Sequence, residues 1–401
     1  MCKLFSKIQP GSVKIMLESV KFKNFKSFTK ETLIDLRPSK IEYLNETNVS
    51  KDGVLKGCAF YGSNASGKTN ALNAITILLD LLFKPYAVSP ESFTRFNNEK
   101  KMWFEYAFKI DGHSIVYSFE FDRIRGITDE KLTQDGEKLL DRQIGSAKSF
   151  ITENTDYDEV DRNTLFLRNI YFNTKFAGRP ILNKWFEYLK NSIFFNPIRA
   201  ISKLVYFDAK KDQELFLEQY LEAHGEKDIN EFLHYFDFPF SISYQSRKNA
   251  IGPFPSVQLI PAEFRIQFNR EGMASIPLYM ESAGNQILLS FLPAYLMVVK
   301  NGGMLAIDEF SSGFHNDLEE LLVKYFYEKC PNGQIFFVSH STNILKTSII
   351  RPDQVYAVDF DETGSVITKF SQHGMRESQN MEKMYLSGAF GGLPLYETKS
   401  N

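Results

Sequence analysis

The stretch with the clearest chemistry is a run of eight residues, Gly62-Ser63-Asn64-Ala65-Ser66-Gly67-Lys68-Thr69. These types and this spacing fit the pattern G-x-x-x-x-G-K-[ST], a loop that surrounds phosphate groups between a strand and a helix. Glycines let the backbone wrap the phosphates, and the N–H groups at the start of the following helix face their negative charge. We expect Lys68 to reach the β- and γ-phosphates and Thr69 to present its hydroxyl to Mg²⁺. The run and the adjacent Asn70 therefore predict an ATP-binding site, and the alternative is a simple Gly/Ser turn.

Two further groups of polar residues follow apolar stretches in the second half of the chain. Asp308 and Glu309 come directly after the apolar residues 304–307, and His340 follows the apolar residues 334–338. Asp308 can hold Mg²⁺ opposite Thr69, and Glu309 can polarise an attacking water molecule. His340 can contact the γ-phosphate or that water. The alternatives are an ordinary acidic pair after a strand and a histidine that only hydrogen-bonds to its neighbours.

A Ser/Gly-rich segment, Ser282-Ala283-Gly284-Asn285-Gln286, precedes the acidic pair and begins an apolar helix. Such a helix start is a natural anion-binding element. For its own chain's nucleotide it would duplicate the phosphate loop, so we expect Ser282 and Gly284 to contact a nucleotide held by a second copy. The alternative is ordinary helix capping by serine.

The elements needed to position these residues can be read from the apolar spacing. A strand over 58–61 and a buried helix over 71–83 flank the phosphate loop, and a second apolar helix over 285–300 ends at Gly302-Gly303. Apolar strands that alternate with helices in the second half predict a mainly parallel sheet covered on both faces. Alternating residues from 16 onward and over 101–122, with a turn at Asp111-Gly112, predict an antiparallel sheet beside it.

We divide the chain into four parts on this basis. Residues 16–134 contain the antiparallel sheet and the phosphate loop, and residues 135–250 form a mostly helical insertion. Residues 251–370 contain the Ser/Gly, acidic and histidine segments, and residues 371–401 form a C-terminal tail. A strand is expected over 256–269, and residues 1–15 read as a loose extension.

Composition limits the class of protein. The formal net charge of −2 gives no overall basic signal for nucleic acid. The three cysteines, Cys2, Cys58 and Cys330, have no disulfide or metal-binding spacing, which favours a reducing cytoplasm. The N-terminus has no signal-peptide pattern, and the longest apolar run, 287–299, is too short to span a bilayer and contains Pro293. We expect a cytoplasmic protein with no membrane partner.

The order of these segments resembles the ABC-type ATPase heads of the SMC/RecF/OLD kind. The resemblance implies a P-loop α/β head with an antiparallel β subdomain and a helical insertion, in which two copies sandwich two ATP molecules. Lys68, Thr69, Asp308, Glu309 and His340 match that family well, whereas the ESAGNQ segment around Ser282 and Gly284 departs from its LSGGQ form. By the same resemblance, His315 corresponds to a histidine that follows the acidic pair, and Gln134 and Gln143 are candidates for the glutamine loop.

The C-terminal sequence, RPDQVYAVDFDETGSV followed by MRESQNMEKMYLSGAFGGLPLY, resembles the RloA/AbiL-type ATPases of bacterial phage defence. That resemblance implies an ATP-dependent homodimer or higher oligomer that acts as sensor or scaffold for a separate effector, often a TOPRIM-type nuclease.

Three other functions remain open from the sequence. The chain could itself be an OLD-like nuclease that binds metal through Asp359 and Asp361. It could be a RecF/SMC-like factor that binds DNA, with Lys203, Lys210 and Lys211 among its few candidate contacts. It could also be a nucleotide-gated scaffold with little hydrolysis.

Overall fold

The computed structural model describes residues 15–84, 88–152, 155–176, 178–197, 201–203, 216–246, 262–374 and 379–393. The extension expected at residues 1–15 lies outside this range except for Ile15, which begins the first strand.

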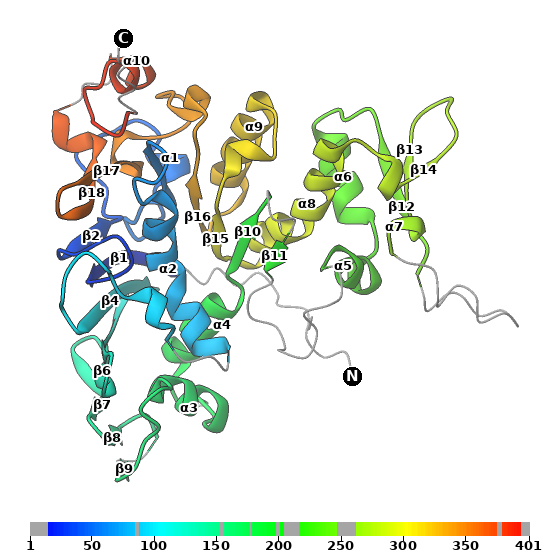
Figure 1. Ribbon diagram of the computed structural model, residues 1–401. Coiled ribbons are helices and arrows are strands. Elements are labelled where there is room, and N and C mark those ends of the chain that lie inside the picture. The colour runs from blue at the N-terminus through cyan, green and yellow to red at the C-terminus, as the bar shows by residue number, and fades with distance from the viewer. Residues whose placement is uncertain are drawn as a thin grey trace, which may run out of the picture.

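A seven-stranded sheet forms the centre of the molecule, in the order β11-β10-β15-β16-β3-β17-β18 (Figure 1). Its five inner strands are parallel, and the two edge strands are antiparallel to their neighbours. The strands are β3 (Gly57–Gly62), β10 (Ile193–Asn196), β11 (Ile201–Lys203), β15 (Gly303–Ile307), β16 (Gly333–Val338), β17 (Val355–Asp361) and β18 (Gly364–Lys369). The mainly parallel α/β fold expected from the sequence is confirmed.

Both faces of this sheet are covered. Along β3, Cys58 and Phe60 pack into the core on one face, and Ala59 and Tyr61 pack into the core on the other. The first core contains α2 (Lys68–Phe83) and α4 (Pro180–Lys190), and the second contains α8 (Ala283–Asn301) and α9 (Asn316–Lys329). Burial on two faces explains why the inner strands are nearly continuous apolar runs.

The second sheet is antiparallel, with eight strands in the order β2-β1-β4-β5-β6-β7-β8-β9. These are β1 (Ile15–Lys23), β2 (Thr32–Asp35), β4 (Lys101–Ile110), β5 (His113–Asp122), β6 (Gly126–Gln134), β7 (Glu137–Gln143), β8 (Ser146–Ser149) and β9 (Thr155–Tyr157). The turn expected at Asp111-Gly112 joins β4 to β5.

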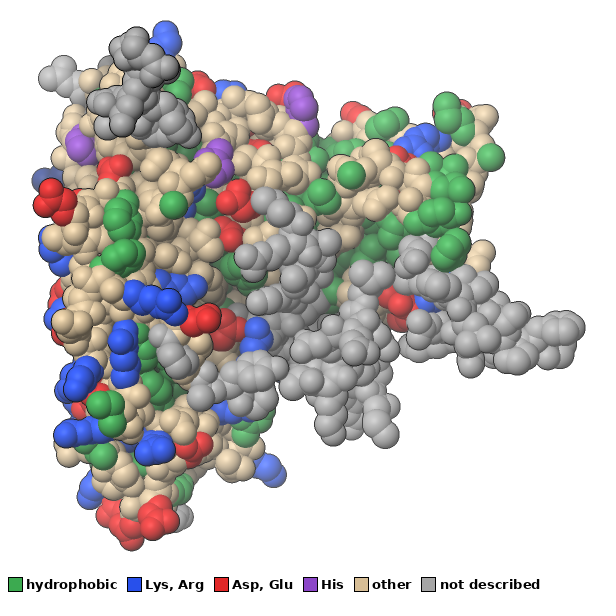
Figure 2. All heavy atoms as spheres, in the orientation of Figure 1, with side chains coloured by type: hydrophobic (Ala, Val, Ile, Leu, Met, Phe, Trp, Pro, Cys, Tyr) green, Lys and Arg blue, Asp and Glu red, His purple; other side chains and the backbone are tan. Residues whose placement is uncertain are grey.

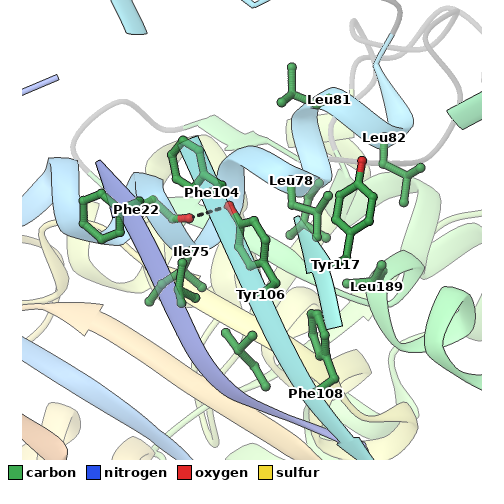
Figure 3. Packing of buried hydrophobic residues seen from close by; sticks show 14 of the residues in the cluster. Phe22, Ile75, Leu78, Leu81, Leu82, Phe104, Tyr106, Phe108, Tyr117 and Leu189 are labelled. Atoms are coloured by element: carbon green, nitrogen blue, oxygen red, sulfur yellow. Dashed lines mark hydrogen bonds between the residues drawn. The ribbon is translucent and has the colours of Figure 1, made fainter. Parts of the chain in front are cut away.

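Helix α2 packs between the two sheets. Figure 3 shows Ile75, Leu78 and Leu82 of this helix beside aromatic rings of the antiparallel sheet. The Tyr106 hydroxyl also donates a 2.8 Å hydrogen bond to the Ala74 carbonyl of α2. The helix that carries the phosphate loop is therefore held on both sides by buried apolar surface.

The boundary drawn between residues 134 and 135 falls inside the antiparallel sheet. Asp135-Gly136 forms a hairpin turn, with φ of 51° and 82°, and β7 to β9 continue the sheet as far as Tyr157. An Asp-Gly pair with two positive φ values is the same turn signal that the sequence gives at Asp111-Gly112. Helical structure in the insertion begins only at α3 (Phe166–Asn173).

Strands β10 and β11, which lie inside the insertion, join the central sheet. A small lobe, seen on the right of Figure 1, is formed by the part of the insertion from residue 216 onward together with residues 262–277. It contains α5 (Phe216–His224), α6 (Lys227–Tyr235), β12 (Ser241–Tyr244), α7 (Ala262–Arg265), β13 (Ile266–Asn269) and β14 (Ile276–Pro277). A strand is expected over 256–269, of which residues 262–269 are described. In that part, α7 covers the first four residues and strand β13 the last four.

Two short helices complete the described chain, α1 (Asn45–Asn48) and α10 (Met381–Leu386). The apolar helix expected over 285–300 is confirmed as α8, which ends at Gly302 with φ 78°. Among the described residues, no helix combines the length and the apolar character needed to cross a membrane.

Candidate active site

Three neighbouring parallel strands bring the predicted residues to one edge of the central sheet. The phosphate loop follows β3, His340 lies just beyond β16, and Asp308 and Glu309 follow β15. Because carboxyl ends of adjacent parallel strands meet at the same edge, this edge is where an α/β protein normally binds its ligand. A cavity of about 640 Å³ opens here. It is lined by Asn64, Ala65, Gly67, Lys68, Thr69, Asn70, Glu309 and His340.

The phosphate loop is tightly fitted against its neighbours. A Cβ added at Gly62 would collide with the Val358 carbonyl, and one at Gly67 would collide with the Ser365 hydroxyl. Gly67 also has φ 112°, which an L side chain rarely adopts. Both glycines of the pattern are therefore required by close approach of the backbone to other chain segments.

Hydroxyl groups from distant segments support the loop from behind. The Ser365 hydroxyl donates to the Ser66 carbonyl at 2.6 Å and lies 2.7 Å from the Ser27 hydroxyl. The side-chain amide of Asn70 donates to Ser27 at 2.7 Å. Ser27 and Ser365 were not identified from the sequence, because neither lies in a recognisable pattern.

Lys68 places a buried positive charge on the floor of the cavity. The residue is 6% exposed, and its Nζ donates to the carbonyls of Gly62 at 3.0 Å and Ser63 at 2.8 Å. Burial lowers the pKa of Lys68, while the carboxylates of Glu309 and Asp308 act in the opposite direction. Phosphate oxygens bound at this position would satisfy the same ammonium group.

The donors beside Lys68 have the chemistry that Mg²⁺ prefers. The Thr69 hydroxyl donates to Asp308 Oδ1 at 2.9 Å, so a hydroxyl and a carboxylate oxygen meet at the cavity. Asn196, at the end of neighbouring β10, donates its amide to Asp308 Oδ2 at 3.2 Å. The residues present therefore fit the metal. Asn196 was missed in the sequence, although a polar residue that ends a parallel strand is a usable signal.

Glu309 and His340 face each other across the cavity. Glu309 Oε2 lies 3.8 Å from His340 Nε2, and the Ser312 hydroxyl donates to the same oxygen at 3.2 Å. Glu309 has φ 57° and ψ 45°, an uncommon backbone conformation for a residue with a side chain. The backbone N–H of His340 donates to the Ser311 hydroxyl at 3.0 Å. Two turns therefore fix the direction in which this pair points.

The surroundings of His340 lower its pKa and so favour the neutral imidazole. Burial lowers its pKa, and the positive charge of Lys68 lowers it further, against the opposing effect of Glu309 and Asp308. A neutral imidazole has one donor and one acceptor nitrogen. It can therefore donate to a phosphate oxygen or accept from a water molecule in the cavity.

A buried carboxyl group lies behind this site. Glu319, in the first turn of α9, is 0% exposed, and neither of its oxygens has a hydrogen bond of acceptable geometry among the described residues. Burial raises its pKa to about 7, although the nearby Ser341 side chain acts in the opposite direction. Nothing in the sequence singles out Glu319, because a glutamate on a polar helix is expected to be exposed.

Ser282 and Gly284 lie elsewhere on the surface and do not line the cavity. Ser282 caps α8, since its hydroxyl accepts from the Asn285 N–H at 3.4 Å. A Cβ at Gly284 would meet nothing within 4 Å. The structure thus shows the capping role of Ser282, and contact of either residue with a second copy's nucleotide stays a prediction.

Other candidates from the sequence have ordinary structural surroundings. Exposed His315 caps α9 by accepting from the Asp317 N–H. Gln134 and Gln143 lie in strands β6 and β7 of the antiparallel sheet, outside the cavity lining.

The residues proposed for two of the alternative functions can also be placed. Asp359 accepts from the Gly392 N–H at 2.7 Å, and Asp361 accepts from Thr363 in a turn. Among the described residues no group of three or more His, Cys, Asp or Glu could hold a metal ion. The side chains of Lys203, Lys210 and Lys211 lie outside the described residues.

Solved structures with a similar fold include three SMC head domains. The SMC head domain from Thermotoga maritima is 14% identical, with a TM-score of 0.49, over 88% of this chain and 98% of that chain. An SmcHead bound to the C-winged helix domain of ScpA is 15% identical, with a TM-score of 0.49, over 88% and 96%. An Smc head with an extended coiled coil, bound to the C-terminal domain of ScpA derived from Pyrococcus furiosus, is 13% identical, with a TM-score of 0.45, over 89% and 97%.

Sequence comparison identifies the family. A search of curated proteins gives no match. The sequence profile of one family, described as "AAA domain, putative AbiEii toxin, Type IV TA system", matches residues 58–346, more than half of the chain. This range starts in β3 beneath the phosphate loop and ends beyond His340, so it includes the whole cavity lining. The chain belongs to this AAA domain family.

Proposed function

We propose that the chain is a Mg²⁺-dependent ATPase that assembles on ATP and acts as the sensor or regulatory subunit of a bacterial antiphage system. One observation carries the ATPase part of this proposal. The hydroxyl of Thr69 meets the carboxylate of Asp308 at 2.9 Å beside the buried Lys68, and Glu309 and His340 face the same cavity. A phosphate-binding group, a metal-binding pair and a candidate base are thus within one cavity.

The geometry supports hydrolysis of the terminal phosphate. Lys68 binds and orients the β- and γ-phosphates of the substrate, and the N–H groups at the start of α2 face the same oxygens. Thr69 and Asp308 would hold Mg²⁺, which neutralises charge on the phosphates. Glu309 accepts a proton from a water molecule while the oxygen of that water bonds to the γ-phosphorus. The bond from the γ-phosphorus to the β–γ bridging oxygen breaks at the same time. The products are ADP and inorganic phosphate.

His340 completes this arrangement from the opposite side. As a neutral imidazole 3.8 Å from Glu309, it can donate to a γ-phosphate oxygen while Glu309 holds the water. Its neutral state keeps a second positive charge away from Lys68. We assign His340 a role in aligning the phosphate and water.

The first test compares ATP binding and hydrolysis in the wild type, Lys68→Ala and Glu309→Gln. Lys68→Ala should weaken ATP binding by at least about a hundredfold, because the phosphates lose a buried cation. Glu309→Gln should bind ATP with near wild-type affinity but hydrolyse it at least about a hundredfold more slowly, because the amide cannot accept the proton. Titration calorimetry with a non-hydrolysable ATP analogue and phosphate release give the two readouts.

The exposed Lys51 provides a control for this test, since Lys51→Ala removes a positive charge away from the cavity. Normal ATP turnover by Lys68→Ala would contradict the site assignment. Loss of ATP binding in Glu309→Gln would contradict the role given to Glu309. ATP binding without turnover in the wild type would favour a nucleotide-gated scaffold over an enzyme.

The antiphage part of the proposal is supported by the resemblance of the C-terminal sequence to RloA/AbiL-type ATPases and by the toxin–antitoxin system named in the family description. We propose a separate effector, a TOPRIM-type nuclease, encoded beside this gene. Cells that carry both genes should resist phage infection, either by surviving it or by aborting it. The Lys68→Ala variant should abolish this resistance. Equal plaque formation on cells with and without the gene pair, over a panel of unrelated phages, would count against the defence role.

A further inference from the structure

The C-terminal segment 379–393 returns to the edge of the central sheet that carries the candidate active site. It consists of α10 followed by a glycine-rich turn, and Figure 1 shows α10 above β17 at this end of the molecule. The sequence gives these residues no chemical role. Their contacts, however, reach both the phosphate loop and the segment that follows His340.

The first contact is with the start of the phosphate loop. A Cβ at Gly392 would lie 3.4 Å from the Gly62 Cα, 3.5 Å from the Tyr61 carbonyl oxygen and 3.5 Å from the Ala357 Cβ. The Gly392 N–H donates to Asp359 Oδ1 at 2.7 Å, which fixes the turn on β17. The turn at Gly392 therefore lies beside the start of the phosphate loop, with space for little more than a Cβ between them.

The second contact is with the turn that carries His340. Thr342, two residues after His340, donates its hydroxyl to Glu382 Oε1 at 2.6 Å. Tyr61, the last residue but one of strand β3, donates its hydroxyl to the Ser341 carbonyl at 3.1 Å and packs edge-on against Tyr385 of α10. Glu382 and Tyr385 thus hold the two strand ends from one short helix.

The segment is itself well anchored. The rings of Phe390 and Phe370 stack with centroids 4.0 Å apart, and Phe370 also stacks on Tyr385 at 5.8 Å. The Tyr385 hydroxyl donates to the Gly392 carbonyl at 3.4 Å, which ties the turn back to the helix. Because these internal contacts hold the segment together, its contact with the phosphate loop and its contact with Thr342 are coupled through it.

From these contacts we propose that residues 379–393 help to position the residues of the ATP site. Glu382 is a positioning residue that holds His340 in place through Thr342, and Gly392 supports the phosphate loop at Gly62. The inference rests on the proposed function, because positioning has meaning only if the cavity binds and hydrolyses ATP. It adds that the nucleotide site is completed by the C-terminal segment, so an effector bound there would sense the site directly.

The Glu382 contact is tested by kinetics. Glu382→Ala should lower kcat about tenfold while the ATP dissociation constant stays within about twofold, because a hydrogen bond to a charged group is lost outside the phosphate cradle. Glu382→Gln keeps an acceptor oxygen and should restore most of the rate. Thr342→Val should behave like Glu382→Ala, and the double variant should be no worse than either, as expected for two partners in one contact.

The neighbouring Lys383→Ala is the matched control on α10, since the Lys383 side chain is exposed and has no role in this contact. A rate for Glu382→Ala equal to that of Lys383→Ala would overturn the positioning role. An equal loss in Glu382→Gln and Glu382→Ala would show that the contact is not the cause and would overturn it as well.

The Gly392 contact is tested by a pair of glycines. Gly392 has φ 76° and is enclosed, whereas Gly388 has φ 82° and nothing within 4 Å of its added Cβ. Gly392→Leu and Gly388→Leu therefore carry similar backbone strain, but only the first side chain must displace Gly62 or the segment. We expect Gly392→Leu to bind ATP at least about tenfold more weakly than Gly388→Leu, because overpacking at Gly392 displaces the start of the phosphate loop.

These experiments separate the inference from the function on which it depends. If the wild type binds and hydrolyses ATP and Lys68→Ala does not, the proposed function stands, and equal ATP affinities in the two glycine variants would overturn this inference alone. If the wild type does not bind ATP, both are wrong. Circular dichroism on each variant establishes that the chain is folded before affinities are compared.

Discussion

At the scale of single residues, the buried charged groups in and behind the candidate site differ in how many hydrogen-bond partners they have. Lys68 is held by two loop carbonyls, and Asp308 is held by Thr69 and Asn196. Glu319 has no such support among the described residues, so its ionised form is costly and its pKa rises to about 7. A group in this condition makes the stability of the fold depend on pH.

Glu319→Gln should therefore reduce the pH dependence of stability. The folded-state pKa of about 7 lies above the ordinary glutamate value of 4.5, so between these values the folded protein holds a proton that the unfolded chain has released. The contribution of Glu319 to stability thus falls as pH rises through this window and stays low above pH 7. Urea unfolding at pH 5 and pH 8 should show a smaller difference for Glu319→Gln than for the wild type.

Glu328→Gln provides the control on the same helix, because Glu328 is exposed. The gain for Glu319→Gln at pH 8 should be roughly 1–3 kcal/mol, the usual cost of an unsatisfied buried polar group. A pH profile for Glu319→Gln that superimposes on those of the wild type and Glu328→Gln would show that the Glu319 carboxyl is not the source.

Residues with a chemical signature were predictable, and residues that act by position were not. The phosphate-loop spacing identified Lys68 and Thr69, and the ends of apolar strands identified Asp308, Glu309 and His340. Asn196 carries the same strand-end signal, although its strand was not recognised. Ser27 and Ser365 become relevant only when the fold brings the turn after β1 and strand β18 beside the loop. No local pattern encodes that neighbourhood, because it depends on strand order.

At the scale of elements, the buried side chain of Gln334 links the central sheet to the antiparallel sheet. Gln334 of β16 accepts at Oε1 from the Leu17 N–H at 2.7 Å and from the Tyr188 hydroxyl at 2.6 Å. Its Nε2 donates to the carbonyls of Leu17 and Leu55, each at 2.9 Å. One glutamine thus satisfies groups from β1, from α4 and from the segment before β3. Buried polar groups of this kind are costly when left without partners.

Gln334→Leu should therefore destabilise the fold by roughly 2–5 kcal/mol, because it leaves several buried donors and acceptors unpaired while keeping a similar volume. Gln143→Leu makes the same chemical change at an exposed position of β7 and should stay within about 0.5 kcal/mol of the wild type. Urea-induced unfolding followed by tryptophan fluorescence measures both, since Trp185 is buried against the same core. Equal midpoints for the two variants would show that Gln334 does not join the sheets energetically.

Sequence reasoning at this scale worked where periodicity was strong. Strands β3, β15 and β16 and helices α2 and α8 follow directly from apolar spacing. Strand β10 does not, because it lies in a stretch whose spacing predicts a mostly helical insertion. Sequence reasoning failed at β7 to β9, where short polar strands have little periodicity and only the Asp135-Gly136 turn marks the hairpin. It also failed at α7, where four residues of helix precede β13 inside a stretch with strand-like composition. Tertiary pairing decided these segments, so local propensity could not.

At the scale of the whole molecule, apolar surface is concentrated on the lobe of the insertion. Figure 2 shows hydrophobic side chains gathered on the right, over the region of α5 to α7 and β12 to β14 in Figure 1. Phe264, Met273, Tyr279 and Met280 are between 44% and 71% exposed, and the rings of Phe264 and Tyr279 lie 4.6 Å apart. This surface borders Ser282 and Gly284 in the sequence. Exposed apolar patches beside polar residues are typical of assembly surfaces.

ATP-dependent assembly through the start of α8 leads to the last prediction. Gly284 and Gly178 are both exposed, neither has a positive φ, and a Cβ at either position meets nothing within 4 Å. Gly284→Arg and Gly178→Arg should therefore fold alike, yet only the first should block a second copy. In a Glu309→Gln background with ATP, light scattering after size exclusion should show a dimer or larger species for Gly178→Arg and a monomer for Gly284→Arg. Unchanged assembly in Gly284→Arg would place the contact between copies elsewhere, because an arginine cannot fit between α8 and a nucleotide held by a partner.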